Sequence, residues 1–171
     1  TLAPLQGVKF EVYSEAGDLI ETLTTDTNGQ ATTSLLPYGN YTLLETETLA
    51  GYVLADEQEF SIFVAPVNGV YQTQNLTIRN TPIKAYLQIN KVDAETLAPL
   101  QGVEFEVYSE AGDFIETLTT DTNGQVTTSL LPYGNYTLLE TETLAGYVLA
   151  DEQEFSIFVA PVNGVYQTQN L

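Results

Sequence analysis

The stretch LTIRNTPIKAYLQINKV, residues 76–92, lies, apart from its first residue, in the only part of this 171-residue chain that occurs once. Residues 1–76 recur as residues 96–171, at an offset of 95 positions (96 − 1). The unique stretch therefore contains the end of one repeat and the beginning of the next, which places the start of a natural repeat near Pro82. The two copies differ at three positions, Lys9/Glu104, Leu19/Phe114 and Ala31/Val126.

The repeat length and the alternation of residue types predict an all-β fold with tandem β-sandwich domains. A period of 95 residues exceeds the roughly 20 to 50 residues of solenoid repeats and suits a sandwich of about 100 residues. Val8, Phe10 and Val12 alternate with polar residues, as in a half-buried strand. We predict two domains: residues 1–82 form a repeat without its first strand, and residues 83–171 form a repeat without its last strand.

The composition supports a separate core in each domain. Hydrophobic residues make up 43% of the chain, which includes 11 Tyr and 7 Phe, so disorder is not expected. We expect about seven or eight strands in a complete repeat. They include residues 30–36 and residues 70–79, and each of these segments follows an Asn-Gly pair, which accepts the positive φ angles of a tight turn.

The charge and the missing residue types exclude several classes of function. The chain carries 4 basic and 23 acidic residues, a formal net charge of −19, whereas nucleic acids and anionic membranes bind proteins rich in Lys and Arg. Neither is expected as a partner. The chain has no Cys and no His, which removes disulfides, the usual zinc sites and Cys-based or His-based catalysis. The acidic balance suits a solvated extracellular surface.

The turn at residues 26–29 has a second interpretation, as part of a calcium loop. Asp26 and Asn28 would supply the first ligands, but the segment lacks the later ligands and the closing Glu of an EF-hand. We therefore predict no metal and no cofactor, with calcium at Asp26 and Asn28 as the alternative.

Two polar side chains in the unique stretch point where apolar residues point. In an extended segment Asn80 shares one face with Ile78, and Lys91 shares one face with Ile89, because side chains alternate along a strand. Lys is seldom fully buried, so a solvated strand end is the other interpretation.

A third polar residue, Glu45, shares a strand face with Tyr41 and Leu43, and its duplicate is Glu140. A carboxyl group in an apolar core should either be paired or have a raised pKa and keep its proton. A Lys facing the same core would have a lowered pKa, which favours the neutral, nucleophilic amine. That amine could attack an Asn carboxamide while the Glu hydrogen-bonds the carbonyl oxygen and passes a proton to the leaving ammonia. The product is a Lys–Asn isopeptide bond.

Five segments carry a resemblance to a known family: LTIRNTP (76–82), LQINKVD (87–93), LAPLQGVEFEVYSEAGD (97–113), TDTNGQ (120–125) and LLPYGNYTLLETETLAGYVL (130–149). They resemble the Cna-B or SpaA-type repeat domains of Gram-positive surface adhesins and pilins. The resemblance implies a prealbumin-like, inverse-Ig-like Greek-key sandwich in which a first-strand Lys bonds to a last-strand Asn beside a catalytic Glu. By position, Lys91 and Asn80 match the crosslinked pair, and Glu45 and Glu140 match the catalytic acid.

Neither repeat contains all three of these residues. The Lys of the first repeat would fall at −4 (91 − 95), and the Asn of the second would fall at 175 (80 + 95). Asn80 and Lys91 therefore belong to neighbouring repeats, and we expect their bonding partners in adjacent repeats or in another copy of the chain. Neighbouring identical repeats and strand-swapped or crosslinked copies are the expected partners.

The resemblance implies a structural function: a rigid stalk repeat of an adhesin or pilus-like protein on a bacterial surface, anchored to the cell wall through a region outside this chain. It implies no enzyme activity beyond self-crosslinking. One alternative is a module that binds a host protein or glycan through its Tyr-rich strands or the acidic loop at residues 56–59. Another is an enzyme that uses Glu45 and Glu47, which would lie roughly 6.6 Å apart on one strand face, near the spacing in inverting glycosidases.

Overall fold

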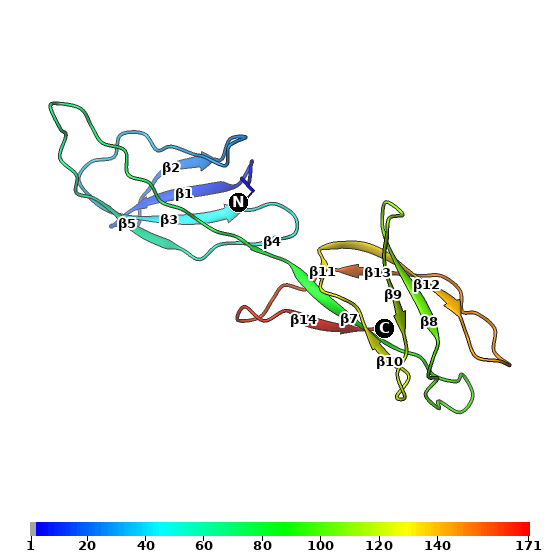
Figure 1. The fold of residues 1–171 in the computed structure, drawn as a ribbon. Coiled ribbons are helices and arrows are strands. Elements are labelled where there is room, and N and C mark those ends of the chain that lie inside the picture. Colours follow the sequence, from blue (N-terminus) through cyan, green and yellow to red (C-terminus); the bar gives the residue numbers. More distant parts are fainter. Residues whose placement is uncertain (1–2) are drawn as a thin grey trace. The chain divides into compact units, whose positions relative to one another are not determined.

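The computed structural model describes residues 3–171, and this part of the chain consists of β-strands, turns and loops without any helix. It therefore offers no helix that could span a membrane. The chain divides into two compact units, Thr1–Thr81 and Pro82–Leu171, which are labelled strand by strand in Figure 1. The predicted all-β class is confirmed.

The second unit is a sandwich of two sheets. One sheet has the strand order β13-β12-β8-β9, and in the other β7 lies beside β10, β11 and β14. The unit has eight strands, within the predicted range, which are β7 (Lys84–Asn90), β8 (Glu104–Ser109), β9 (Phe114–Thr119), β10 (Gln125–Thr127), β11 (Leu131–Pro132), β12 (Gly134–Glu142), β13 (Gln153–Ile157) and β14 (Gln167–Asn170).

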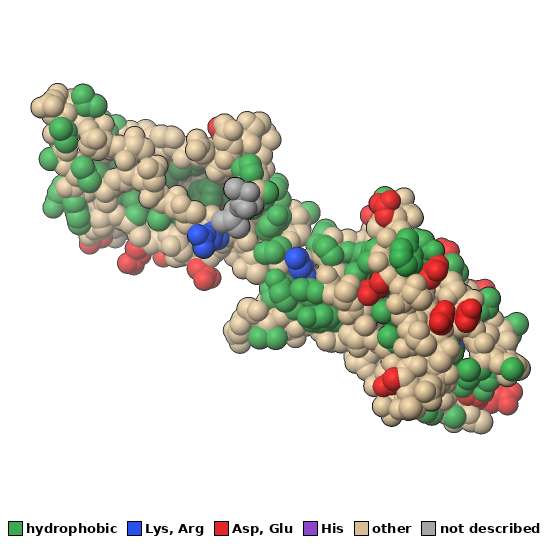
Figure 2. All heavy atoms as spheres, viewed as in Figure 1, with side chains coloured by type: hydrophobic (Ala, Val, Ile, Leu, Met, Phe, Trp, Pro, Cys, Tyr) green, Lys and Arg blue, Asp and Glu red, His purple; other side chains and the backbone are tan. Residues whose placement is uncertain are grey.

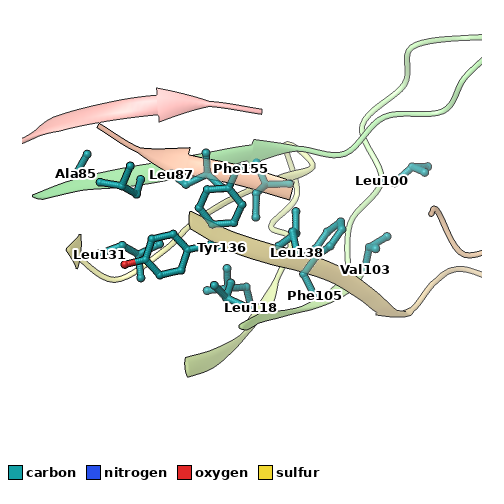
Figure 3. Close-up of a cluster of buried hydrophobic side chains, with 13 residues drawn as sticks. Ala85, Leu87, Leu100, Val103, Phe105, Leu118, Leu131, Tyr136, Leu138 and Phe155 are labelled. Atoms are coloured by element: carbon teal, nitrogen blue, oxygen red, sulfur yellow. The ribbon is translucent and has the colours of Figure 1, made fainter. Parts of the chain in front are cut away.

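Strand β7, from the unique stretch, is the centre of its sheet. Ala85 pairs with Leu131 of β11 on one side and with Gln167 of β14 on the other. The pairing with β10 and β11 is antiparallel, whereas the pairing with β14 is parallel. Alternate side chains of β7, those of Ala85, Leu87 and Ile89, are buried. They close the core between the two sheets, part of which is drawn in Figure 3.

The first unit repeats only one of these sheets. Its four-stranded sheet has the order β2-β1-β3-β5, the same arrangement as β9-β8-β12-β13, and β4 pairs with β6 in a two-stranded sheet. Its buried cluster is much smaller and contains Val12, Leu36 and Tyr41. The strands are β1 (Lys9–Ser14), β2 (Leu19–Thr24), β3 (Gly39–Glu47), β4 (Tyr52–Val53), β5 (Gln58–Ile62) and β6 (Thr81–Pro82).

Two predicted strands are wrong for the first unit. Residues 30–36 lie in irregular structure, and residues 70–79 contain only an isolated bridge between Val67 and Val70 across an Asn-Gly turn. Their copies in the second unit do contain strands, β10 and β11 in one case and β14 in the other. The physical reason is long-range pairing: these short strands form only where β7 supplies backbone partners.

Gly124 allows the turn before β10 to approach the end of β7. The Lys91 N–H donates to Gly124 O at 2.8 Å, Gly124 has a φ of 68°, and a Cβ there would lie 2.4 Å from Lys91 O. By contrast, Gly112 has a φ of 82° with nothing within 4 Å of an added Cβ.

We expect Gly124→Ala to lower the free energy of unfolding of the second unit much more than Gly112→Ala. Both variants strain a left-handed residue, at a cost of about 1 to 3 kcal/mol, but only Gly124→Ala must also displace the backbone at Lys91, which directly follows β7. Urea unfolding followed by NMR signals of the second unit would measure both costs. Equal losses in the two variants would contradict a tight approach of this turn to β7.

Candidate functional site

The first unit contains a buried carboxyl group paired with the predicted amide. Glu45 on β3 is 4% exposed. Its Oε1 accepts a hydrogen bond from Asn80 Nδ2 at 2.6 Å, and its Oε2 accepts one from the Ala55 N–H at 3.0 Å. Asn80 Nδ2 also donates to Val53 O at 3.0 Å. The Asn carboxamide is thus held by two acceptors, with its nitrogen against the carboxylate.

A hollow of about 360 Å³ adjoins this pair. Ala55, whose N–H binds Glu45, and Arg79, which precedes Asn80, both line it. The other lining residues are Asp56, Gln58, Thr77 and Ile78. Glu45 and Asn80 themselves do not line this hollow.

The second unit contains the same carboxyl group paired with the predicted amine. Glu140 on β12 is 3% exposed, and its Oε2 accepts hydrogen bonds from Lys91 Nζ at 2.7 Å and from the Ala150 N–H at 3.2 Å. Its other oxygen, Oε1, is buried without a hydrogen-bond partner among the described residues. The corresponding oxygen of Glu45 is the one that Asn80 occupies in the first unit.

The two centres are complementary halves of one arrangement. The predicted burial of Glu45 and Glu140 is confirmed, because equivalent strand positions turn both side chains into the sandwich. The structure brings Asn80 to Glu45 and Lys91 to Glu140. It does not bring Lys91 and Asn80 to one centre.

The surroundings of Glu140 determine its protonation state. Burial raises the pKa of Glu140, but the hydrogen bond from Lys91, the neighbouring Thr143 hydroxyl, the Ala150 N–H and the positive charge of Lys91 lower it, and the net effect is a pKa below the ordinary value. Of the two alternatives for a buried Glu, a paired carboxylate and a protonated acid, the lowered pKa and the contact with Lys91 favour the first at Glu140.

Glu45 and Glu47 do not form the two-carboxylate site that an enzyme would need. A register irregularity interrupts the pairing of β1 with β3 between Lys9 and Phe10, opposite these two residues. Glu47 is exposed and lies 2.7 Å from Lys9 Nζ, whereas Glu45 is buried. The two carboxylates therefore face different surroundings.

The Asp26 turn uses its carboxylate for backbone hydrogen bonds. Asp26 Oδ1 accepts from the N–H groups of Asn28 at 2.8 Å and Gln30 at 2.9 Å. These bonds, with the one from Gln30 the stronger influence, hold the pKa of Asp26 below its ordinary value. The same residues make the same turn at Asp121. Over residues 3–171, no cluster of three or more acidic side chains is arranged to hold a metal ion.

Sequence reasoning missed the backbone groups that complete both centres. The Val53 carbonyl, at the end of β4, and the Ala55 N–H come from the segment between β3 and β5, and the Ala150 N–H comes from the equivalent segment between β12 and β13. A side-chain pattern contains no signal for such groups. In the second unit, Tyr147 holds this segment near the end of β7, because its hydroxyl donates to Asp93 Oδ2 at 2.8 Å. The sequence analysis included Asp93 only as part of the LQINKVD segment.

One family model matches most of the chain. The family model described as SpaA, prealbumin-like fold domain, matches residues 1–80 and 85–170. The Serine-aspartate repeat-containing protein F of Staphylococcus epidermidis is 29% identical over 180 residues, which cover 96% of this chain and 10% of that protein. The chain thus spans about a tenth of the length of the curated relative.

Two solved structures extend the comparison. The Bacillus anthracis TIE protein aligns with a TM-score of 0.78 and 28% identity, over 97% of this chain and 30% of that one. GBS52, the minor pilin of Streptococcus agalactiae, aligns with a TM-score of 0.44 and 23% identity, over 99% of this chain and 82% of that one.

The ion pair at Glu140 predicts a specific pH dependence. Because the folded-state pKa of Glu140 lies below its unfolded value, its stabilisation is fully present above the ordinary Glu pKa of about 4.3 and is lost as pH falls through the folded-state pKa. At neutral pH we expect Glu140→Gln to lower the free energy of unfolding of the second unit by about 1 to 3 kcal/mol, and the difference should shrink in acid. The rate of hydrogen exchange at the Leu87 amide, compared between the unmodified chain and the variant over a range of pH, would measure this difference in the free energy of unfolding. A pH-independent difference would contradict the ion pair.

Proposed function

The chain belongs to the family of SpaA domains with a prealbumin-like fold, and we propose that it is a stalk segment of a bacterial cell-surface adhesin or pilus-like protein, stabilised by Lys–Asn isopeptide bonds that a buried Glu promotes. One observation carries this proposal: in each of two units whose repeats are nearly identical in sequence, a buried Glu contacts one of the two residues that such a bond joins.

The bond would form by exchange of an amide. The proton that Lys91 Nζ shares with Glu140 across 2.7 Å passes to the carboxylate, which leaves a neutral amine beside a neutral acid. The amine attacks Cγ of the Asn carboxamide, and the Glu proton stabilises the developing oxyanion and then moves to the departing nitrogen. As the C–N bond to Nζ forms and the Cγ–Nδ2 bond breaks, the attacking nitrogen gives its extra proton to the carboxylate. The departing ammonia then takes up that proton and leaves as ammonium. The carboxyl group ends as it began, so no external reagent is consumed.

The buried position favours this transfer. A charged amine and a carboxylate are both destabilised by removal from water, whereas their neutral forms are not. When an amide fills the remaining side of the centre, as Asn80 does at Glu45, the ion pair loses its last solvent contact. Transfer of the proton from Lys91 to Glu140 then gives a neutral amine and a neutral acid, whose free energy becomes comparable to that of the ion pair. The neutral pair is the reactive one.

The repeat arithmetic defines where the bond belongs. Asn80 contacts Glu45 in the first unit, and Lys91 contacts Glu140 in the second. In an array with the same 95-residue period, Lys91 would join the Asn at the position equivalent to Asn80 one repeat later. The bond would therefore close each unit from its first strand to its last.

A bond of this kind suits a load-bearing spacer. By the loop-entropy model of a disulfide, closing a loop of most of a domain contributes about 4 to 5 kcal/mol of stability. The bond would also carry a pulling force between the two ends of the domain without unfolding it. An extracellular location follows for the family, and the acidic side chains displayed over both units in Figure 2 suit a solvated surface. Anchoring to the cell wall through a region beyond these residues is part of the proposal.

A second candidate function, binding of a host protein or glycan, is favoured by one repeated feature. Tyr38 and Phe63 are 79% and 53% exposed with their ring centroids 4.7 Å apart, and Tyr133 and Phe158 form the same pair at 4.9 Å. Exposed aromatic pairs are typical of contact surfaces. If this candidate is right, replacing both Tyr by Ala should abolish binding of the chain to an immobilised matrix protein or glycan array. Failure of the unmodified chain to bind any such ligand would contradict it.

The isopeptide bond predicts a change in intact mass. A protein that runs from Pro82 through the Asn equivalent to Asn80 should lose one ammonia, and tryptic mapping should find Lys91 joined to that Asn. The Glu140→Ala variant should keep its full mass, because the amine and the amide would lack the proton carrier. An unmodified mass in the first protein would refute the crosslink and leave an ordinary sandwich domain.

A further inference from the structure

The chain contains four Asn-Gly pairs, and the structure places them in two kinds of turn. Two pairs lie in the Asp turns, residues 26–29 and 121–124, in which an Asp side chain accepts backbone hydrogen bonds. The other two lie at the hairpin tips, residues 67–70 and 162–165, each of which is closed by one isolated bridge. Each kind of turn therefore occurs twice with the same residues, once in each unit.

An Asn followed by Gly can react without a partner protein. The backbone nitrogen of the Gly attacks Cγ of the Asn side chain, because Gly has no Cβ to obstruct the approach and lets the backbone rotate. The attack requires that the Gly N–H give up its proton to solvent and that the Asn carboxamide turn toward the nitrogen. Hydrogen bonds that hold either group oppose the reaction, because they must break first.

In the Asp turns both groups are held. The Gly124 N–H donates to Asp121 O at 2.9 Å, and the Asn123 N–H donates to Asp121 Oδ1 at 2.8 Å. Asn123 Nδ2 also donates to Asp121 Oδ2 at 3.4 Å. The turn at residues 26–29 has the same hydrogen bonds. The attacking nitrogen and the carboxamide are thus both restrained in each Asp turn.

At the hairpin tips neither group is held. The N–H groups of Val162 and Val165 donate to each other's carbonyls at 3.0 and 2.9 Å, but within residues 3–171 no hydrogen bond involves the Gly164 N–H or the Asn163 side chain. The whole tip is exposed, and the residues on either side of it lie outside strands. Such a segment opens at a low cost in free energy. The tip at residues 67–70 has the same features.

We propose that Asn68 and Asn163 are sites of spontaneous modification, at which the side-chain amide is converted to a carboxylate through a succinimide ring. Asn28 and Asn123 are protected from the same reaction by the Asp turns. The flanking sequences do not distinguish the two classes by themselves, because every one of these Asn residues precedes Gly. The distinction lies in which turns hold the reacting groups.

Water is the only reagent that the reaction consumes. At Asn163 the Gly164 nitrogen gives its proton to solvent and bonds to Cγ, the Cγ–Nδ2 bond breaks, and Nδ2 takes a proton from solvent and leaves as ammonia. Water then adds to one of the two ring carbonyls. Addition at Cγ gives Asp, and addition at the backbone carbonyl gives isoaspartate, in which the chain runs through the former side chain. Either product is a carboxylate at neutral pH.

The modification would change a neutral part of an acidic chain. Residues 60–78 and 155–171 contain no Asp, Glu, Lys or Arg, although the chain has a formal net charge of −19. The new carboxylate would lie between Val162 and Val165, which are 57% and 63% exposed. Isoaspartate also lengthens the backbone of a two-residue turn, whose geometry closes the bridge. The tip would therefore gain charge and lose its bridge as the protein ages.

Deamidation at the tips is independent of the proposed isopeptide bond. Asn80 precedes Thr81 rather than Gly, and its Nδ2 is held by two acceptors. A succinimide ring loses one ammonia, as an isopeptide bond does, so intact mass alone does not distinguish them. Peptide mapping does, because the ring stays within one peptide and the isopeptide bond joins two.

The test incubates the full 171-residue chain at mildly alkaline pH and maps it at mildly acidic pH, where ring formation is slow, with a protease that cleaves after Glu. Each Asn-Gly pair then lies in a peptide of its own sequence, and these peptides are residues 22–45, 60–95, 117–140 and 155–171. Fragmentation spectra assign the modified Asn in each peptide.

We expect deamidation of Asn68 and Asn163 to be at least about tenfold faster than that of Asn28 and Asn123, because reaction in the Asp turns must first break hydrogen bonds. Isoaspartate should accompany Asp among the products at the two tips. Equal rates at the four residues, or faster reaction in the Asp turns, would overturn the proposal.

The same incubation in guanidinium chloride separates structure from sequence. In the unfolded chain all four pairs are solvated, so the difference between the hairpin tips and the Asp turns should disappear. A difference that persists without the fold would come from the flanking residues and would refute protection by the Asp turns.

A matched pair of variants tests the cause of the protection. Asp121→Ala removes the carboxylate that holds Asn123 and should speed its deamidation by about tenfold, the value of one to two hydrogen bonds. Asn28, whose turn is intact in this variant, should stay slow. Asp26→Ala should give the reverse pattern. An unchanged rate at Asn123, or an equal rise at Asn28, in the Asp121→Ala chain would overturn the assigned protection.

Discussion

The pairing of one strand, β7, with three short partners determines what each unit can become. In the second unit β7 gives backbone partners to β10, β11 and β14 and places Ala85, Leu87 and Ile89 over the opposite sheet. Removing apolar surface from water contributes roughly 25 cal/mol per Å², and the strand delivers this burial together with its hydrogen bonds. The first unit has the same sheet and the same partner segments, but a much smaller buried cluster. Cooperation between hydrogen bonding and burial explains why the short strands and the large core appear together.

The buried carboxylates are the second consequence of this arrangement. A Glu on the central strand of a sandwich is stable only if its oxygens are satisfied. At Glu45 the donors are an amide and a backbone N–H, and at Glu140 they are an amine and a backbone N–H. The loop after β12 supplies the backbone donor, and Tyr147 ties that loop to Asp93, two residues beyond Lys91. The strand that covers the core and the loop that covers the carboxylate are therefore linked.

The ionised state of Glu140 adds a constraint on any chemistry at this centre. Its pKa lies below the ordinary value because the hydrogen bonds and charge of its partners outweigh burial, so the amine and the acid begin as an ion pair. An isopeptide reaction must therefore start with a proton transfer between Lys91 and Glu140, and exclusion of water by the arriving amide is the step that would favour it. The orphaned Oε1 of Glu140 is where that amide would bind.

The sequence by itself determined the repeat, the all-β class, the turns and the burial of Glu45 and Glu140, because strand alternation and Asn-Gly turns are local signals. It also identified Asn80 and Lys91 as polar groups directed inward. Only the tertiary structure decided which carboxylate each of them meets, that Glu140 is ionised, and that backbone groups of Ala55 and Ala150 complete the centres. It also decided that one copy of residues 30–36 contains strand while the other does not. Segments that are identical except for one residue gave different structures because a strand exists only when a distant segment pairs with it, and no local pattern records the presence of that partner.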